Sequence, residues 1–332
     1  MLLRPPSIPY RSSPSFAAPI IPFILPRTHL MPLHEPELPA GSQLSHLDHR
    51  RDIVGMTYVY PVVSRRAGGV SVGINLNPNN ACNWHCLYCQ VPQLTRGSAP
   101  PIDLPLLEQE LKALLEALIH GDFMAKRVPD GLRHIQDIAL SGNGEPTSAR
   151  EFPEVIECVA RLRNQSGLNA PLRLITNGSL LHQPRVQEGI ACLGHHHGEV
   201  WFKLDAGTRH GMQRINGADL DPAGVIERLR TCARLCDTWV QTCCITLDGQ
   251  TPDATETDAW LEVLRQASLA EAGNHNPQEA ASQHRLIGVH LYGLARPSMQ
   301  EDAHRLGSAP RAWMDALAAR VRQLGLSVRV SP

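Results

Sequence analysis

The chain has 332 residues, which is enough for one large α/β domain or two small ones with complete hydrophobic cores. Its net charge of -1 excludes a global positive field of the kind that attracts nucleic acid, although a local patch stays compatible with the composition. The nine cysteines are odd in number and unevenly spaced, unlike a secreted disulfide framework, so we expect a cytoplasmic protein.

The first fifty residues differ from the rest in composition. They are dense in proline and serine and show neither helical nor alternating periodicity, so residues 1–50 are predicted to be a disordered leader before a domain at 51–332. The sequence leaves open whether translation starts at Met1 or Met31. Residues 15–26 are apolar, but three prolines interrupt them and they are too short to span a bilayer, so we expect no membrane association.

From about residue 70, short apolar segments typical of strands alternate with longer segments of helical period. Six such units imply parallel strands joined by right-handed crossovers. A complete barrel needs eight units, so we expect a partial, TIM-like open (β/α)6 barrel with outer helices, although an open doubly wound sheet is the alternative. The expected pairs are strand 69–78 with helix 104–121, 134–142 with 150–163, 172–178 with 183–192, 199–207 with 221–235, 238–247 with 255–268, and 285–295 with 310–324.

The loop after the first predicted strand contains the motif "CNWHCLYC", with Cys82, Cys86 and Cys89. A disulfide would leave one of the three cysteines over. A structural zinc ion needs four ligands, and the fourth candidate is His85, because no second C-x2-C pair follows at a suitable distance. Three thiolates suit three irons of a [4Fe-4S] cluster and leave the fourth iron open to a substrate or cofactor.

The motif resembles the C-x3-C-x-aromatic-C signature of radical S-adenosylmethionine enzymes, and the resemblance covers roughly residues 70–298. It implies a [4Fe-4S] cluster on the three cysteines and S-adenosyl-L-methionine on the open iron. Reductive cleavage would then yield a 5'-deoxyadenosyl radical that abstracts hydrogen from a substrate. Tyr88 matches the aromatic position beside the adenine, and a packed loop aromatic is the alternative.

The second predicted strand ends in "LSGNGEPT", a departure from the commoner G-G-E-P form of the family. The resemblance implies that Gly142, Asn143, Gly144 and Glu145 receive the methionine amino group, since glycine lets a backbone approach a ligand and a carboxylate accepts from an ammonium. An ordinary turn with Thr147 as helix cap is the alternative.

Later strand ends add further polar candidates. Thr176 and Asn177 in "TNGSL" occupy the position of polar cofactor contacts in the family, although Asn-Gly is also a common turn signal. Lys203 and Asp205 in "WFKLDAG" lie on one side of a strand, so we expect them to meet each other or a charged ligand, with a catalytic role. The last predicted strand adds His290 and Arg296, and Arg296 is a cofactor-binding candidate.

Other conspicuous residues have simpler interpretations. Cysteines 232, 236, 243 and 244 fall on a predicted helix and a central strand, which favours buried core positions over an auxiliary cluster. The three histidines at 195–197 fall in a connecting loop and are interpreted as a solvated polar turn.

Within the family, "SGNGEPT", "LITNGSLL", "WFKLDAG" and "ARPS" most resemble the Fe-S oxidoreductases related to tRNA wybutosine-synthesis enzymes. The resemblance implies an oxidoreductase acting on an unidentified substrate, RNA or protein, with an external flavodoxin- or ferredoxin-like electron donor. A glycyl-radical-enzyme activase is one alternative. A non-catalytic Fe-S or zinc-binding protein is the other.

Overall fold

The computed structural model describes residues 43–45, 51, 53–64, 68–269, 284–294 and 296–331, all within one compact unit, Leu33–Pro332. The predicted leader lies outside the described residues except for positions 43–45. There Leu44 is buried, and its backbone N–H donates to the carbonyl of Arg127 at 2.7 Å. The disorder of the leader stays a prediction.

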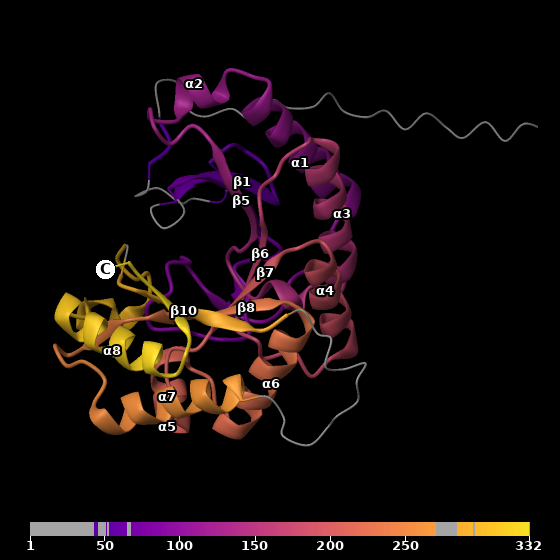
Figure 1. Ribbon diagram of the computed structural model, residues 1–332. Coiled ribbons are helices and arrows are strands. Elements are labelled where there is room, and N and C mark those ends of the chain that lie inside the picture. Colours follow the sequence, from indigo (N-terminus) through magenta and orange to yellow (C-terminus); the bar gives the residue numbers. More distant parts are fainter. Residues whose placement is uncertain are drawn as a thin grey trace, which may run out of the picture. The chain divides into compact units, whose positions relative to one another are not determined.

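A single eight-stranded sheet forms the centre of the fold (Figure 1). Every strand pairing from β2 to β12 is parallel, and only β1 pairs antiparallel, with β2. The order in the sheet is β1 (Val59–Ser64), β2 (Gly69–Ile74), β5 (Ile135–Leu140), β6 (Leu172–Thr176), β7 (Glu199–Lys203), β8 (Asp237–Cys243), β10 (Leu286–Tyr292) and β12 (Ser327–Ser331). The predicted α/β class with a mostly parallel sheet is therefore confirmed.

The six predicted helices are all present, with ends that differ by a few residues from the prediction. Neighbouring helices pack in chain order, α1 on α3, α3 on α4, α4 on α6 and α6 on α7, while α8 packs on β10 and β12. Figure 1 shows α1, α3, α4 and α6 following one another along one side of the sheet. The helices are α1 (Leu104–Ile119), α3 (Phe152–Gln165), α4 (Pro184–His195), α6 (Pro222–Leu235), α7 (Ala254–Ser268) and α8 (Arg311–Gln323).

Several elements were not predicted from the sequence. The strands β1 and β12 flank the six predicted ones, and α5 (Arg209–Asn216) follows β7. Helix α5 is short and polar, and it depends on its caps: Thr208 accepts from the N–H of Gly211, and Gly217 ends it in the left-handed region with φ +59°. The other short elements are α2 (Phe123–Arg127), β3 (Ala81–Cys82), β4 (Thr95–Arg96), β9 (Ile245–Leu247), β11 (Leu306–Ser308), and the 3-10 turns Pro146–Ser148 and Glu301–Arg305.

Alternation along the strands separates an apolar face from a polar one. In β6, Leu172 and Leu174 are fully buried in the hydrophobic core with the helices, while Arg173 and Ile175 line a cavity on the other face. The same division in β2 and β5 places Ser71 and Asp137 at the cavity. Because successive strand side chains point to opposite faces, every parallel strand contributes to both the core and the cavity.

The segment before β1 is held by a buried carboxylate from α1. Glu110 is 8% exposed and accepts from the backbone N–H groups of Thr57 and Tyr58, both at 2.7 Å, and of Val59 at 3.3 Å. A buried acceptor with three backbone donors fixes where β1 enters the sheet.

We therefore expect Glu110→Ala to lower the free energy of unfolding by on the order of 2–3 kcal/mol, because three backbone donors lose their charged acceptor. Chemical denaturation measures the change. The control is Glu116→Ala, an exposed position on the same helix, which is expected to stay within about 0.5 kcal/mol of the parent. Equal effects of the two substitutions would contradict the role of Glu110.

Candidate functional site

The three motif cysteines lie in the loop after β2, as predicted, and open on one cavity. Cys82, Cys86 and Cys89 are partly buried and help to line a cavity of about 430 Å³ at the polar face of the sheet. The loop therefore places all three thiols at the cavity that residues from the strand ends also line.

The spacing of the sulfurs separates the zinc and cluster interpretations. The Sγ atoms of Cys82, Cys86 and Cys89 do not all lie within 4.8 Å of one another. Zinc–sulfur bonds of about 2.3 Å would place the sulfurs around one ion about 3.8 Å apart. In a [4Fe-4S] cluster each thiolate binds a different iron, which requires a wider triangle. Sulfurs that do not all lie within 4.8 Å of one another favour the cluster over a single ion.

Hydrogen bonds and burial influence the protonation of these thiols. The Trp84 N–H donates to Cys82 Sγ at 3.5 Å, and Asn216 Nδ2 donates to Cys86 Sγ at 3.3 Å. Burial raises the pKa of Cys82 to about 11 and that of Cys86 to about 12, and it also raises the pKa of Cys89. Because metal-bound cysteine is a thiolate, metal binding here must displace protons.

The turn after β5 packs directly against the segment that leads into the cysteine loop. Asn143 donates from its N–H to Asn75 Oδ1 at 3.0 Å and from Nδ2 to Asn80 Oδ1 at 2.7 Å. A Cβ at Gly142 would lie 2.2 Å from Asn75 Oδ1, and one at Gly144 would lie 2.1 Å from Ala81 O. Both glycines are required by this close approach, which sets the position of the chain just before Cys82.

Glu145 is a buried junction between β5 and β6. It is 2% exposed, and its Oε1 accepts from the N–H and hydroxyl of Thr147 and from the Thr176 hydroxyl, while Oε2 accepts from the Asn177 N–H at 2.7 Å. Burial raises its pKa, while these donors act in the opposite direction. Oε1 is saturated, and Oε2 has one protein donor, so Oε2 retains capacity for a ligand.

The predicted Thr176–Asn177 pair connects this junction to the cysteine loop. Asn177 Nδ2 donates to Asn83 Oδ1 at 2.8 Å, and Asn83 Nδ2 donates to the Ser179 hydroxyl at 2.7 Å. Gly178 adopts φ +68°, and a Cβ there would collide with the Phe202 ring at 2.1 Å. The Asn-Gly sequence thus forms a tight turn, and its asparagine side chain also binds the cysteine loop.

Tyr88 and Asp205 contact each other below the cysteine loop. The Tyr88 hydroxyl donates to Asp205 Oδ2, which also accepts from Asn216 Nδ2 at 2.7 Å, while Oδ1 accepts from the Cys243 N–H at 2.9 Å. Asn216 is the residue that donates to Cys86 Sγ. Asp205 therefore orients the cluster loop through two side chains.

Lys203 lines the cavity and forms no ion pair with Asp205, so of the two predicted partners, Asp205 or a charged ligand, the ligand stays a prediction. Its Nζ donates to the Tyr292 hydroxyl at 3.2 Å and lies 4.9 Å from the centre of the Tyr88 ring. Asp205 lies beyond the end of β7 and binds residues of the cysteine loop and of α5, while Lys203, the last residue of β7, faces the cavity.

The last two predicted candidates have different surroundings. Arg296 lines the cavity and donates to the side-chain oxygen of Gln90, next to Cys89, while Gln90 Nε2 donates to the Arg296 carbonyl at 3.1 Å. His290 is instead packed between Trp201 and Trp239, with ring centroids 4.6 Å from each.

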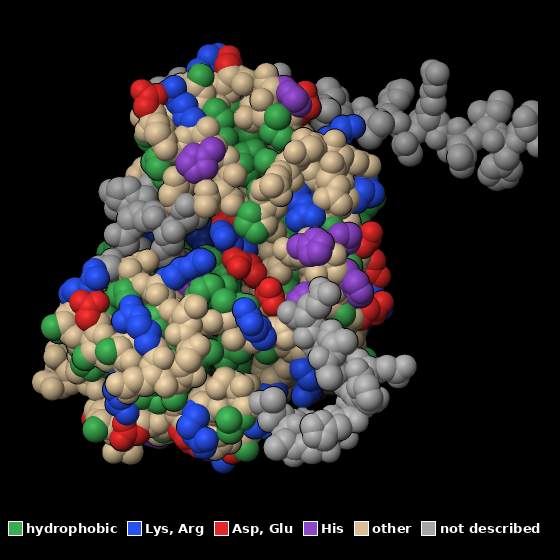
Figure 2. Space-filling view, viewed as in Figure 1, with side chains coloured by type: hydrophobic (Ala, Val, Ile, Leu, Met, Phe, Trp, Pro, Cys, Tyr) green, Lys and Arg blue, Asp and Glu red, His purple; other side chains and the backbone are tan. Residues whose placement is uncertain are grey.

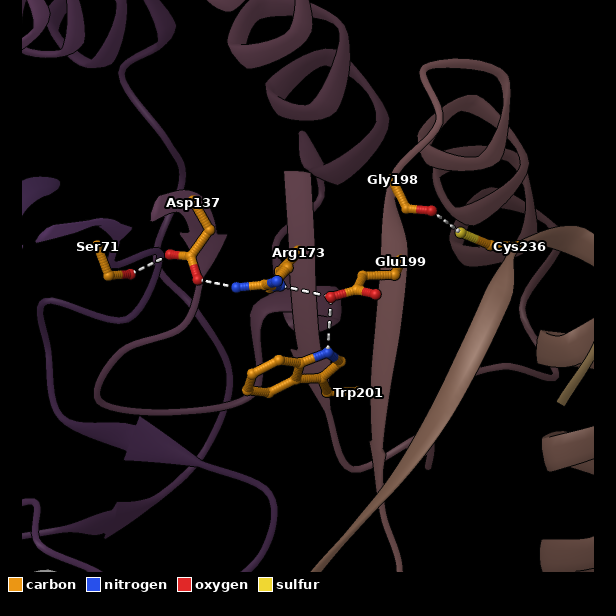
Figure 3. Close-up of polar contacts among 7 residues, drawn as sticks. All are labelled: Ser71, Asp137, Arg173, Gly198, Glu199, Trp201 and Cys236. Carbon is orange, nitrogen blue, oxygen red and sulfur yellow. Dashed lines mark hydrogen bonds and ion pairs between the residues drawn. The ribbon is translucent and has the colours of Figure 1, made fainter. Parts of the chain in front are cut away.

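A chain of polar contacts across four strands forms the floor of the cavity, and sequence reasoning missed it (Figure 3). Ser71 donates to Asp137, Arg173 donates to both Asp137 and Glu199, and Trp201 Nε1 donates to Glu199 at 3.1 Å. The signal available was a charged residue inside each of three apolar strands. Only the strand order shows that these charges compensate one another.

Gln241 is a polar residue of the cavity floor, and its side-chain NH₂ group donates to no described residue. It is 2% exposed and lines the cavity, and its Nε2 has no hydrogen-bond partner among the described residues. A buried amide donor without a partner is costly, which makes it a candidate ligand contact.

The remaining cysteines of the predicted core are buried as expected. Cys232 accepts from the Thr238 hydroxyl at 3.4 Å, and Cys236 Sγ donates to the Gly198 carbonyl at 3.3 Å (Figure 3). Cys243 and Cys244 are 3% and 2% exposed. In the described part of the chain, these cysteines form no group of three ligand atoms close enough to hold one ion.

Within the described ranges, no helix combines the length and apolarity needed to cross a bilayer.

Sequence comparison finds partial similarities. The chain matches no protein-family profile. It is 28% identical over 160 residues to UPF0026 protein slr1464 of Synechocystis sp. (48% of this chain, 52% of that protein) and 27% identical over 230 residues to ribosomal protein uS12 methylthiotransferase RimO of Alkalilimnicola ehrlichii (63% and 48%). It is also 27% identical over 130 residues to GTPase Obg of Brachyspira hyodysenteriae (39% and 17%). The chain thus spans about half or less of each relative's length.

Solved structures with weak similarity include three enzymes. They are a domain of pyruvate-formate lyase-activating enzyme from Bacteroides vulgatus (TM-score 0.39, 12% identity, 59% of this chain, 99% of that chain), the cobalamin-dependent S-adenosylmethionine radical enzyme OxsB (0.43, 12%, 64%, 31%), and anSMEcpe with bound AdoMet (0.37, 15%, 70%, 53%).

Because a Cβ at residue 144 would collide with Ala81 O, we expect Gly144→Ala to lower the free energy of unfolding by about 1–3 kcal/mol and to reduce the iron retained after reconstitution. Gly224→Ala on α6 is the matched control, because its Cβ would meet only the end of the Arg228 side chain, at 3.2 Å. Parent-like stability and iron content of Gly144→Ala would refute the close approach.

Proposed function

We propose that the chain is a radical S-adenosylmethionine enzyme built on a partial, open barrel, related to the Fe-S oxidoreductases of the wybutosine group. The observation that supports this most is that three cysteine sulfurs, which do not all lie within 4.8 Å of one another, line the same cavity as the glycine-rich turn after β5. Cys82, Cys86 and Cys89 would hold the [4Fe-4S] cluster. When bound, the cluster and S-adenosyl-L-methionine supply a 5'-deoxyadenosyl radical that abstracts hydrogen from a substrate.

The residues around the cysteines divide into binding and positioning roles. Glu145 Oε2 and the backbone of 142–144 accept and orient the methionine amino group, while Thr176 and Asn177 hold Glu145 and the loop in place. Tyr88 presents its ring to the cavity, and Asp205 fixes that ring through the hydroxyl. Arg296 donates to the side-chain oxygen of Gln90 and so helps to position the chain beside Cys89.

In this proposal, the substrate binds at the floor of the cavity. Lys203 and the unsatisfied amide of Gln241 offer donors, and Trp201 offers an aromatic surface. Such a floor suits a polar, planar group, which an RNA base or a protein side chain provides. An external flavodoxin- or ferredoxin-like protein would supply the electron.

The ligand assignment predicts a difference between cysteines. Cys86→Ala should leave a folded protein with little iron and no 5'-deoxyadenosine after anaerobic reconstitution and addition of dithionite and S-adenosylmethionine, because one cluster ligand is lost from a loop. Cys158→Ala, at a buried cysteine of α3, should retain both iron and cleavage. Iron content and mass spectrometry of the nucleoside measure the result.

Two outcomes would overturn the proposal. Full iron and turnover in Cys86→Ala would show that the cysteine is not a ligand. One zinc per parent chain, with no iron and no cleavage, would favour the closed-site protein instead.

The role of Glu145 is tested separately. Glu145→Gln keeps the side-chain shape but removes the charge that faces an ammonium group, so affinity for S-adenosylmethionine should fall by about 10- to 100-fold while cluster absorbance is retained. Glu154→Gln, at an exposed position of α3, is the control. Equilibrium dialysis of the reconstituted proteins gives the dissociation constants, and equal values would exclude an amino-group contact.

A further inference from the structure

Glu157, Cys192 and His196 form a second group of potential metal ligands, on the helical side of the sheet. Glu157 lies on α3, Cys192 lies on α4, and His196 caps α4 one turn later. Glu157 Oε2 lies 3.3 Å from Cys192 Sγ and 3.1 Å from His196 Nε2, and the three ligand atoms all lie within 4.8 Å of one another. It is the one such group among the described residues.

We propose that this triad binds a single zinc ion, or a chemically similar divalent transition metal, between α3 and α4. Bonds of about 2.0–2.3 Å to oxygen, nitrogen and sulfur in a tetrahedral site separate the ligand atoms by about 3.3–3.8 Å. The Glu157–Cys192 contact of 3.3 Å lies at the lower end of this range, and the Glu157–His196 contact of 3.1 Å is about 0.2 Å shorter. Small side-chain rotations therefore admit the ion without moving either helix.

The ligand types select the metal. A thiolate with an imidazole suits zinc and its neighbours and does not suit magnesium or calcium, which take oxygen ligands. Glu157 is 64% exposed in its side chain, so water can complete the coordination. Figure 2 shows histidine side chains gathered beside acidic ones over the region of α3 and α4. Arg161, whose charge also acts on Glu157, is paired with Glu108 at 2.8 Å.

Neighbouring contacts already fix the positions of α3 and of the end of α4. Arg163 of α3 donates from both terminal nitrogens to the His196 carbonyl at 3.3 Å, and α3 packs along α4. A bound ion would therefore stabilise an existing helix contact, and a structural role follows. The site is separate from the cavity lined by Cys82, Cys86 and Cys89.

The test uses cobalt as a spectroscopic probe. In a chain with Cys82→Ser, Cys86→Ser and Cys89→Ser, which removes the thiols of the loop, anaerobic titration with Co²⁺ should give one tetrahedral ion per chain with a sulfur-to-cobalt charge-transfer band. Cys192→Ser should abolish that band, and Glu157→Gln should weaken binding at least 10-fold. His195→Gln, next to the triad but not part of it, is the matched control. Zinc at a hundredfold excess over its dissociation constant should raise Tm by roughly 5–10 °C.

The outcomes are distinct. An unchanged cobalt band in Cys192→Ser, or no band in the parent at millimolar Co²⁺, overturns the site. If Cys192→Ser fails to fold, the exposed Glu157→Gln variant decides, and parent-like affinity in that variant overturns the site equally.

Discussion

The candidate site depends on one buried carboxylate. Glu145 is removed from water, which is costly for a charge, and four protein donors compensate it. Those donors come from the turn after β5 and from the end of β6, so the carboxylate fixes two strand ends against each other. The Asn177 amide then carries this geometry to Asn83 in the cysteine loop. The cysteine loop, whose Tyr88 also packs with Cys243 and Ile245, thereby acquires a defined position.

The alternation of the parallel strands explains how the fold tolerates a polar interior. The apolar side of each strand packs on the helices and supplies the stability, so the other side is available for charges. Arg173 lies between Asp137 and Glu199, and its guanidinium also covers the Trp201 ring at 4.9 Å. Nearly every group in this floor has a partner. Gln241 therefore stands out because its amide has none among the described residues.

The sequence predicted the elements well because their signals are local. Strand alternation, helical periodicity and the cysteine spacing each lie within one segment, and the six strand–helix units follow from them. Contacts that arise between segments gave no such signal. Lys203 and Asp205 were expected to meet each other or a charged ligand, and no local pattern indicated that Asp205 accepts from Tyr88 and Asn216, which lie 117 and 11 residues away along the chain. The short helix α5 that carries Asn216 is polar and gave no periodic signal.

The two groups of metal ligands show why spacing alone does not define a site. Cys82 and Cys86 are four residues apart, and so are Cys192 and His196. On the helix this spacing puts both side chains on one face, next to Glu157 from the neighbouring helix, and the three ligand atoms come within reach of a single ion. In the loop, the sulfurs of Cys82, Cys86 and Cys89 do not all come within 4.8 Å of one another. The histidines at 195–197 were interpreted as a solvated turn because their partner lies on α3, and only the packing of α3 on α4 brings it close. The same sequence interval therefore brings potential ligand atoms close together on a helix but not in a loop, and the secondary structure around it makes the difference.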